Sequence, residues 1–248
     1  MTGSLVVVGT GPGKAELMTP ATQAALAAAT DLVGYRPYLA RIAQRADQRR
    51  HVSDNRVELE RAQLALSLAA SGRRVVVVSG GDPGVFAMAA TVFEAVDCGD
   101  PAWRLLDIRV EPGVTAMLAA AAEAGAPLGG DFCAISLSDN LKSWSTIERR
   151  LKAAAEADFV IAVYNPASKA RPHQLTRALD LLRQVKAEDT VVLLVRAAGT
   201  PDSRVIAATL GSADPRDVDM RSLVIIGASN TRRIGRWVYT PRREEGVA

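Results

Sequence analysis

Short apolar runs, each followed by a glycine-rich turn and then a longer apolar segment, organise the first half of the chain. The first run is residues 5–8, Leu-Val-Val-Val, which Gly9 ends. Residues 74–78 and 108–110 repeat the same order of run, glycine turn and apolar segment. Three successive strand-loop-helix units predict an α/β fold with a mostly parallel sheet. The expected helices of this half are residues 20–29, 57–71, 85–96 and 114–124.

The second half has a different pattern. Glycine, alanine and proline gather at residues 125–130, so we expect two lobes, residues 1–125 and 126–241, with a disordered tail at 242–248. Helices are expected at 144–157 and 174–185. The last three strand-like runs leave no room for helices between them, which favours antiparallel pairing and a mixed sheet. The strand-like runs are residues 132–137, 159–164, 191–196, 204–209 and 223–227.

Composition narrows the class of protein. Apolar residues make up 48% and charged residues 23% of the 248, as in ordinary globular proteins. Two cysteines without C-x-x-C spacing and two histidines cannot form a closed zinc site, so no metal is expected. The longest apolar stretches are too short to cross a bilayer, and the start lacks a signal-peptide pattern. We therefore expect a cytoplasmic protein without membrane contact.

The formal net charge is +3, with 30 basic and 27 acidic residues. This balance is compatible with an anionic ligand but does not require one. Aromatic residues are only 4%, whereas proteins that bind nucleic acid commonly combine a basic stripe with aromatic side chains. The composition therefore argues against a nucleic-acid partner.

The first glycine loop, Gly9-Thr10-Gly11-Pro12-Gly13-Lys14, fits neither familiar nucleotide motif. A dinucleotide loop needs G-x-G-x-x-G, and Lys14 occupies the third glycine position. A P-loop needs four residues before its Gly-Lys pair and then Ser or Thr, whereas this loop has three and then Ala15. Taken alone, the loop could be only a tight turn between a strand and a helix.

Two further loops follow predicted strands. Gly80-Gly81-Asp82-Pro83 lets the backbone approach a ligand closely and supplies a carboxylate that could accept from ribose or ammonium groups. Residues 112–116, Pro-Gly-Val-Thr-Ala, place the Thr115 hydroxyl at a helix start, where it could cap the helix or meet a ligand. In open α/β sheets, ligands lie at the carboxyl ends of the strands, so these loops predict a binding site.

Taken in order, the three loops, the Met18-Thr19 pair and the strand end at Gly227 resemble the tetrapyrrole methylase family, the class III S-adenosylmethionine methyltransferases. The resemblance implies two α/β lobes, a homodimer and a methyl donor, S-adenosylmethionine, held between the lobes and released as S-adenosylhomocysteine. The residues implied to contact the donor are Pro12, Gly80, Gly81, Asp82, Val85, Thr115, Ala116, Tyr164, Asn165, Gly199 and Ala228.

Finer motifs resemble one branch of this family, whose members methylate precorrin-3B at C-17 and contract the ring to give precorrin-4 in cobalamin biosynthesis. The motifs are Val33-Gly34-Tyr35-x-x-Tyr38, residues 136–139 with Trp144, and Tyr164-Asn165-Pro166. The anaerobic branch, which acts on cobalt-factor III, remains an alternative, and a nucleic-acid methylase of the same fold is a further one. Many relatives carry an acidic residue where this chain has Lys14, so a role for that carboxylate cannot be carried over.

The implied substrate is a tetrapyrrole with many carboxylates. Because guanidinium groups pair well with carboxylates, some of the chain's many arginines are expected to bind it. Ring contraction also needs a proton to be removed from a hydroxyl, and Asp139 and Lys142 are the candidates for this acid or base role. An ordinary surface role remains open for all of these residues. The candidates for binding substrate carboxylates are Lys14, Arg36, Arg41, Arg45 and Arg171.

Overall fold

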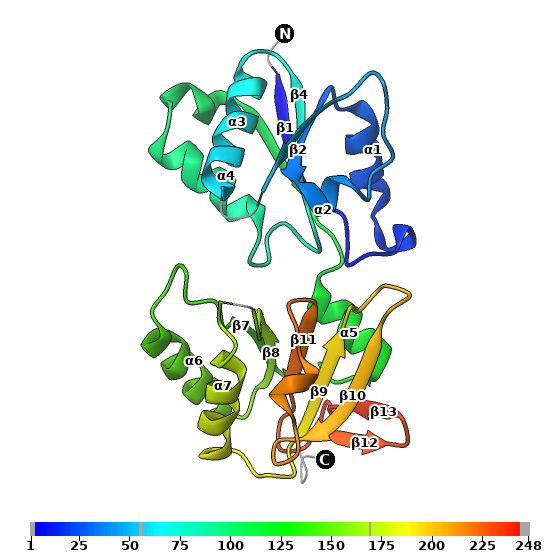
Figure 1. The fold of residues 1–248 in the computed structure, drawn as a ribbon, viewed down its shortest axis with the longest axis vertical. Helices are drawn as coiled ribbons and strands as arrows, with labels where there is room; N and C mark the ends of the chain where they lie inside the picture. The colour runs from blue at the N-terminus through cyan, green and yellow to red at the C-terminus, as the bar shows by residue number, and fades with distance from the viewer. Residues whose placement is uncertain (1–2, 55–56, 169, 244–248) are drawn as a thin grey trace. The chain divides into compact units, whose positions relative to one another are not determined.

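The computed structural model describes residues 3–54, 57–168 and 170–243. The chain forms two compact units, unit 1 (Met1–Ala116) and unit 2 (Met117–Ala248), each with its own central sheet (Figure 1). Unit 1 contains strands β1 (Ser4–Gly9), β2 (Asp31–Tyr35), β3 (Arg49–Ser53), β4 (Arg74–Ser79) and β5 (Asp107–Glu111), helices α1 (Pro20–Ala28), α2 (Arg36–Leu39), α3 (Glu58–Ala70) and α4 (Met88–Cys98), and short 3-10 turns η1 (Ala15–Leu17) and η2 (Pro101–Leu105).

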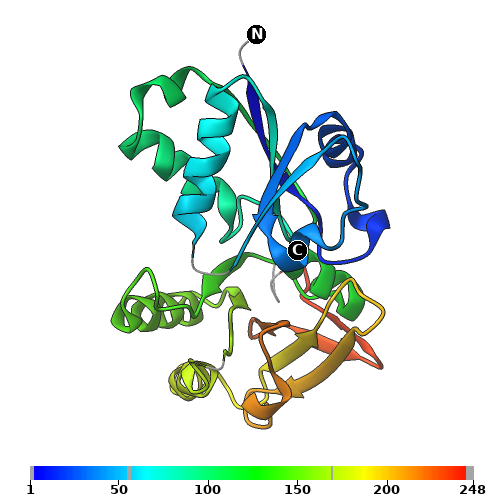
Figure 2. The same ribbon diagram turned by 45° about the horizontal axis from the view of Figure 1, so that its top comes forward.

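The sheet of unit 1 has the order β3-β2-β4-β1-β5, and all its described pairings are parallel. Alternate residues of β1 enter different cores: Leu5 and Val7 pack with α3 and α4, whereas Val6 and Val8 pack with α1 and α2. Figures 1 and 2 show these helix pairs on opposite faces of the sheet. Both faces are covered, which explains why β1 and β4 are continuous apolar runs. The predicted parallel sheet is confirmed, although β2 and β3 were not expected from the sequence.

Unit 2 has a five-stranded sheet of order β10-β9-β11-β8-β7. The described pairing of β7 with β8 is parallel, whereas β11 and β10 are antiparallel to the strands they pair with, so the predicted mixed sheet is confirmed. Helices α6 and α7 cover one face. The elements are α5 (Ala116–Ala124), β6 (Gly125–Ala126), β7 (Phe132–Ser136), α6 (Trp144–Glu156), β8 (Val160–Tyr164), α7 (Gln174–Arg183), β9 (Val191–Arg196), β10 (Arg204–Thr209), η3 (Pro215–Asp217), β11 (Ser222–Ile226), β12 (Arg232–Ile234) and β13 (Trp237–Tyr239).

The division between the units falls after Ala116, nine residues before the boundary expected at 125/126. Helix α5 explains the difference, because its side chains and backbone bond within unit 2: the Met117 amide donates to Tyr164, and Glu123 accepts from the Gly199 amide. Strand β6 also pairs with β13. Of the tail expected to be disordered, residues 244–248 lie outside the described residues, while Arg242 and Arg243 are described.

Candidate functional site

The three glycine-containing loops of unit 1 meet at the carboxyl edge of its sheet. They follow β1, β4 and β5, and these strands are neighbours, so their ends lie side by side. Gly11 and Gly81 exchange two backbone hydrogen bonds, N···O 3.1 and 2.9 Å, and have φ of +71° and +62°. Residues with a side chain rarely adopt these angles, so both positions favour glycine.

The third loop joins this contact through Gly113. A Cβ placed on Gly113 would lie 2.3 Å from the Gly81 carbonyl oxygen and 2.9 Å from the Gly9 Cα, so the three backbones touch. The Asp82 carboxylate links the loops after β4 and β5, because it accepts hydrogen bonds from the backbone amides of Gly84 (2.7 Å) and Gly113 (3.0 Å). The loops therefore form one interlocked backbone surface with a single carboxylate in it.

The predicted donor residues of unit 1 lie on or beside this surface. A Cβ placed on Gly81 would lie 3.7 Å from the Thr115 Cα, so those two residues are adjacent. Thr115 is buried, and Pro12, Val85 and Ala116 are half-buried. The structure brings the three predicted loops of unit 1 together, as the sequence suggested.

Unit 2 presents a second cluster of predicted donor residues where β8 and β9 end. Tyr164 closes β8, and its hydroxyl accepts from the Met117 backbone amide at 3.1 Å. Asn165 follows with φ +51°, held by a hydrogen bond from its Nδ2 to Ser136 Oγ at 2.9 Å. Gly199 lies in the turn after β9 with φ +74°. Non-glycine residues in the left-handed region are strained, and such strain concentrates at binding sites.

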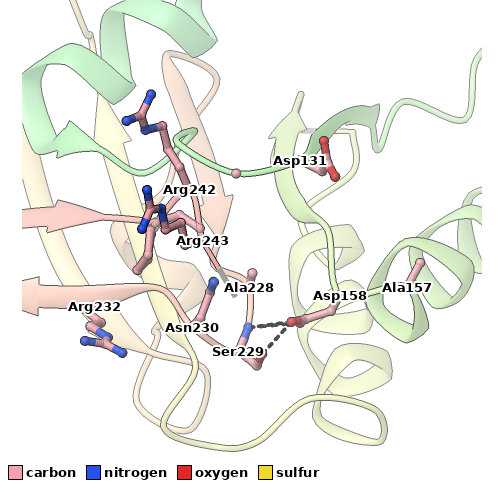
Figure 3. A pocket seen from close by; sticks show the side chains of 12 residues that line it. Asp131, Ala157, Asp158, Ala228, Ser229, Asn230, Arg232, Arg242 and Arg243 are labelled. Atoms are coloured by element: carbon pink, nitrogen blue, oxygen red, sulfur yellow. Dashed lines mark hydrogen bonds between the residues drawn. The ribbon is translucent and has the colours of Figure 1, made fainter. Parts of the chain in front are cut away.

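Ala228 lies at the other edge of this sheet. Strand β11 runs antiparallel to β8 and β9, so the segment after β11 leaves beside the start of β9, where the Gly227 amide donates to Val191 at 2.8 Å. The length of β9, about 16 Å by strand rise, separates it from the turn that holds Gly199. Ala228 lines a pocket of about 470 Å³ together with Asp158 and Ser229. These three residues are labelled in Figure 3. The structure therefore does not group Ala228 with the other predicted donor residues.

The remaining donor residues fit a sulfonium donor. A cationic sulfur is best surrounded by carbonyl oxygens and apolar walls, and the loops of unit 1 supply backbone and small side chains. The Asp82 carboxylate has two oxygens with further acceptor capacity beyond the two amides that it already holds. Among the described residues, no three His, Cys, Asp or Glu side chains form a group that could hold a metal ion.

The candidate acid or base residues lie after β7. Asp139 is exposed, and its Oδ1 lies 3.8 Å from Nε of Arg171, which also donates to Asn140 at 2.6 Å. The structure thus places a candidate catalytic residue beside a candidate substrate-binding residue. Burial and, secondarily, the nearby Arg150 cation hold the pKa of the Lys142 ammonium below its usual range.

The basic candidates of unit 1 have different surroundings. Lys14 is exposed at the start of η1, and Arg36, on α2, lies 3.7 Å from the Asp54 carboxylate. Helix α2 ends at Leu39, so Arg41 and Arg45 follow it instead of extending it. The Arg41 guanidinium lies 5.6 Å from the centre of the Tyr38 ring. The Arg45 guanidinium donates hydrogen bonds to the Asp47 carboxylate and to the Ala27 carbonyl. It would have to give up these partners to bind a substrate carboxylate.

Two residues that bond to predicted donor residues were not among the site candidates from the sequence, although Ser136 belongs to one of the motifs. Ser136 is buried and accepts from both the Asn165 side chain and the Ser138 backbone amide. Glu123 accepts from the Gly199 amide at 2.7 Å. It is the one charged residue in the apolar stretch 114–124, and that isolation could have marked it.

Comparisons with known proteins agree with this arrangement. The family described as "Tetrapyrrole (Corrin/Porphyrin) Methylases" matches residues 4–214. A precorrin-3B C(17)-methyltransferase from Sinorhizobium sp. is 58% identical over the full length of both chains. A cobalamin biosynthesis protein CobIJ of Mycobacterium tuberculosis is 47% identical over 98% of this chain, which spans about half of that protein (49%).

Solved structures show the same fold. The crystal structure of the methyltransferase CobJ is similar over 96% of this chain and 100% of its own, with TM-score 0.94 and 56% identity. A uroporphyrin-III C-methyltransferase from Thermus thermophilus, solved in complex with S-adenosylhomocysteine, has TM-score 0.68 and 25% identity over 91% of this chain and 97% of its own. The interlocked glycine loops, the family match and these full-length similarities show that the chain belongs to the tetrapyrrole methylase family.

Proposed function

We propose that this protein is an S-adenosylmethionine-dependent C-methyltransferase that methylates precorrin-3B at C-17, with ring contraction to precorrin-4 in cobalamin biosynthesis. The observation that carries the proposal is the 58% identity, over both full lengths, to a precorrin-3B C(17)-methyltransferase. A probable cobalt-factor III C(17)-methyltransferase of Salmonella typhimurium is 42% identical over 96% of this chain and 98% of its own, so the cobalt-containing macrocycle is the second candidate substrate.

The donor-binding residues in this proposal are those that each unit groups at one sheet edge. They are Pro12, Gly80, Gly81, Asp82, Val85, Thr115 and Ala116 of unit 1 and Tyr164, Asn165 and Gly199 of unit 2. S-adenosylmethionine supplies the methyl group as an electrophile when it is bound. The protein's part is mainly to orient two bound molecules, which is worth about 7–11 kcal/mol of the barrier.

Asp139 is the proposed base of the contraction step, and its Oδ1 would take the proton from the substrate hydroxyl. The Arg171 guanidinium lies 3.8 Å from this oxygen and keeps the carboxylate beside a proposed substrate-binding residue. Lys14, Arg36, Arg41 and Arg171 are the proposed partners for substrate carboxylates, and Arg45 joins them only if it leaves Asp47.

The oligomeric state and the cellular location are also part of the proposal. We propose that the protein is a homodimer, as the family resemblance implies, and that it works in the cytoplasm. None of the described helices has the length and apolar character needed to cross a membrane. Light scattering of the purified protein tests the dimer, and a monomer at assay concentration would contradict it.

The test of the function is a direct assay with precorrin-3B and a ¹³C-methyl donor. The expected product is a ring-contracted macrocycle that carries one labelled methyl group at C-17, identified by mass spectrometry and carbon NMR. A parallel reaction with cobalt-factor III separates the two candidate substrates. Methylation at another ring position, or of neither macrocycle, would refute the proposed function.

A further inference from the structure

We infer that Glu123 is a positioning residue for the donor site, which it serves by holding the turn after β9 in its binding conformation. The inference rests on the proposed function, because that function makes Gly199 a donor-binding residue. Glu123 is half-buried near the end of α5. Its Oε1 accepts from the Gly199 backbone amide at 2.7 Å, and its Oε2 accepts from the Ser203 hydroxyl.

The turn that Glu123 holds is strained. Ala197 has φ +52° and Gly199 has φ +74°, and residues 197–199 are all buried. A non-glycine residue keeps such a conformation only where its surroundings over-determine it. Within the turn, the Thr200 hydroxyl and amide both donate to the Ala197 carbonyl, at 2.8 and 3.2 Å. The buried Gly199 amide needs an acceptor of its own, and Glu123 provides it.

Helix α5 also reaches the second donor-binding segment of unit 2. Its Met117 amide donates to the Tyr164 hydroxyl at 3.1 Å, and Glu123 lies six residues further along the same helix, a rise of about 9 Å. One short helix is therefore bonded to the end of β8 at its start and to the turn after β9 near its end. The helix therefore links these two segments in addition to the sheet, in which β8 and β9 both pair with β11.

A carboxylate suits this position better than a neutral side chain. It accepts from two donors at once, and a charged acceptor makes a stronger hydrogen bond than an amide does. Glutamine keeps an oxygen for the Gly199 amide, and its NH₂ can donate to Ser203 Oγ in place of the lost contact. Alanine leaves both donors without their partner. The pair of variants therefore separates loss of the contacts from loss of the charge.

The experiment measures S-adenosylhomocysteine binding by calorimetry and thermal unfolding for wild type, Glu123→Ala and Glu123→Gln. Asp214→Ala is the matched control, because Asp214 accepts from the Arg216 backbone amide at 2.8 Å in a turn of the same unit that is not assigned to the donor site. We expect Glu123→Ala to raise the Kd about 10- to 100-fold, and Glu123→Gln to recover most of that loss. Asp214→Ala should lower Tm and leave the Kd unchanged.

Steady-state kinetics distinguish a positioning role from a purely structural one, because only a positioning role should change the donor KM selectively. For Glu123→Ala, KM for S-adenosylmethionine should rise as the Kd does, while kcat at saturating donor and KM for the tetrapyrrole stay within about threefold of wild type. A Kd equal to that of wild type, or an increase matched by Asp214→Ala at equal loss of Tm, would overturn the inference. If Glu123→Ala does not fold, Glu123→Asp replaces it. A folded Glu123→Asp variant that binds S-adenosylhomocysteine as tightly as wild type would overturn the inference. Failure of wild-type protein to bind S-adenosylhomocysteine would instead contradict the proposed function.

Discussion

At the scale of single residues, two buried or half-buried carboxylates of unit 1 have separate tasks at opposite ends of one sheet. Asp82 lies at the carboxyl edge and holds two loop amides. Asp31 begins β2 at the amino edge and is completely buried, with hydrogen bonds from Arg73 (2.7 Å), Thr30 (2.8 Å) and His51 (2.9 Å). Replacing each should therefore affect a different property of the protein.

Asp82→Ala should weaken the binding of S-adenosylhomocysteine about tenfold or more, because it frees the Gly84 and Gly113 amides and removes the only carboxylate from the loop surface. Calorimetry measures the Kd. Asp107→Ala, at an exposed aspartate of the same unit, is the control and should bind as wild type does. Equal affinity for Asp82→Ala would remove this residue from the donor site.

Asp31 should make stability depend on acid pH. Burial alone would raise its pKa, but hydrogen bonds from Arg73, His51 and Thr30 outweigh burial and lower the pKa to about 2. A carboxyl whose pKa is lower in the folded state stabilises the fold above its unfolded pKa of about 4 and loses that contribution as the pH falls toward 2. The contribution is about 2 kcal/mol at neutral pH.

Urea unfolding of wild type between pH 7 and pH 3 should show this loss, and Asp31→Asn should be less stable at pH 7 with a flatter dependence below pH 5. Asp97→Asn, at an exposed aspartate, should follow the wild-type curve. If Asp31→Asn keeps the wild-type slope between pH 5 and pH 3, another group accounts for the acid sensitivity.

Asp139→Asn should slow turnover about 10²- to 10⁴-fold if this carboxylate removes the proton for ring contraction. Donor binding should change little, because Asp139 is exposed, is paired with Arg171 and is not one of the proposed donor-binding residues. Single-turnover assays that follow methyl transfer and contraction separately provide the measurement. Loss of donor affinity together with turnover would indicate a binding or folding role instead.

At the scale of elements, the glycine loops act as a set because their backbones touch. Gly113→Ala would place a Cβ 2.3 Å from the Gly81 carbonyl oxygen, so the loops after β4 and β5 must separate. We expect a loss of about 1–3 kcal/mol in stability, as in other overpacked sites, together with weaker S-adenosylhomocysteine binding. In Gly211→Ala, the new Cβ meets the Glu188 side chain at 3.3 Å, so this control should fold and bind nearly normally. Unchanged binding by Gly113→Ala would show that the donor does not depend on this contact.

The elements also show what the sequence could predict. The strands β1 and β4 are apolar on both faces because helices cover both, and such runs are recognised easily. Strand β2 contains Gly34 in a run of only five residues, and β3 is an edge strand of mainly polar residues, Arg-Arg-His-Val-Ser. Neither has the apolar length or alternation that marks a strand. They join the sheet by pairing, β2 with β4 and β3 with β2.

The sequence predicted the part of the candidate site that depends on local motifs, but not the part that depends on tertiary packing. Local motifs marked the loops of unit 1, because each glycine follows its own strand. The position of Ala228 depends on the direction of β11, which a motif at a strand end does not reveal. Glu123 acts on a residue 76 positions away in the chain, and such contacts are set by tertiary packing.

At the scale of the whole molecule, the net charge of +3 and the candidate basic residues predict different salt responses for the two ligands. Binding of the polycarboxylate tetrapyrrole should weaken as NaCl rises, because salt screens charge pairs at exposed sites, whereas S-adenosylhomocysteine binding should change little. Absorbance titration of the macrocycle and calorimetry of the donor product measure the two dependences. The same salt dependence for both ligands would argue against recognition by Lys14, Arg36, Arg41 and Arg171.

The opposite positions of Asp31 and the glycine loops bear on how such an enzyme adapts to temperature. The Asp31 cluster is centred at the start of β2 and just before β4, with His51 in β3, whereas the glycine loops follow the opposite ends of β1, β4 and β5. Substitutions there should change stability without altering the proposed donor-binding loops. Relatives from hot and cold habitats should therefore differ more around this cluster than in the loops at the other end, and a laboratory search for hardier variants should begin there.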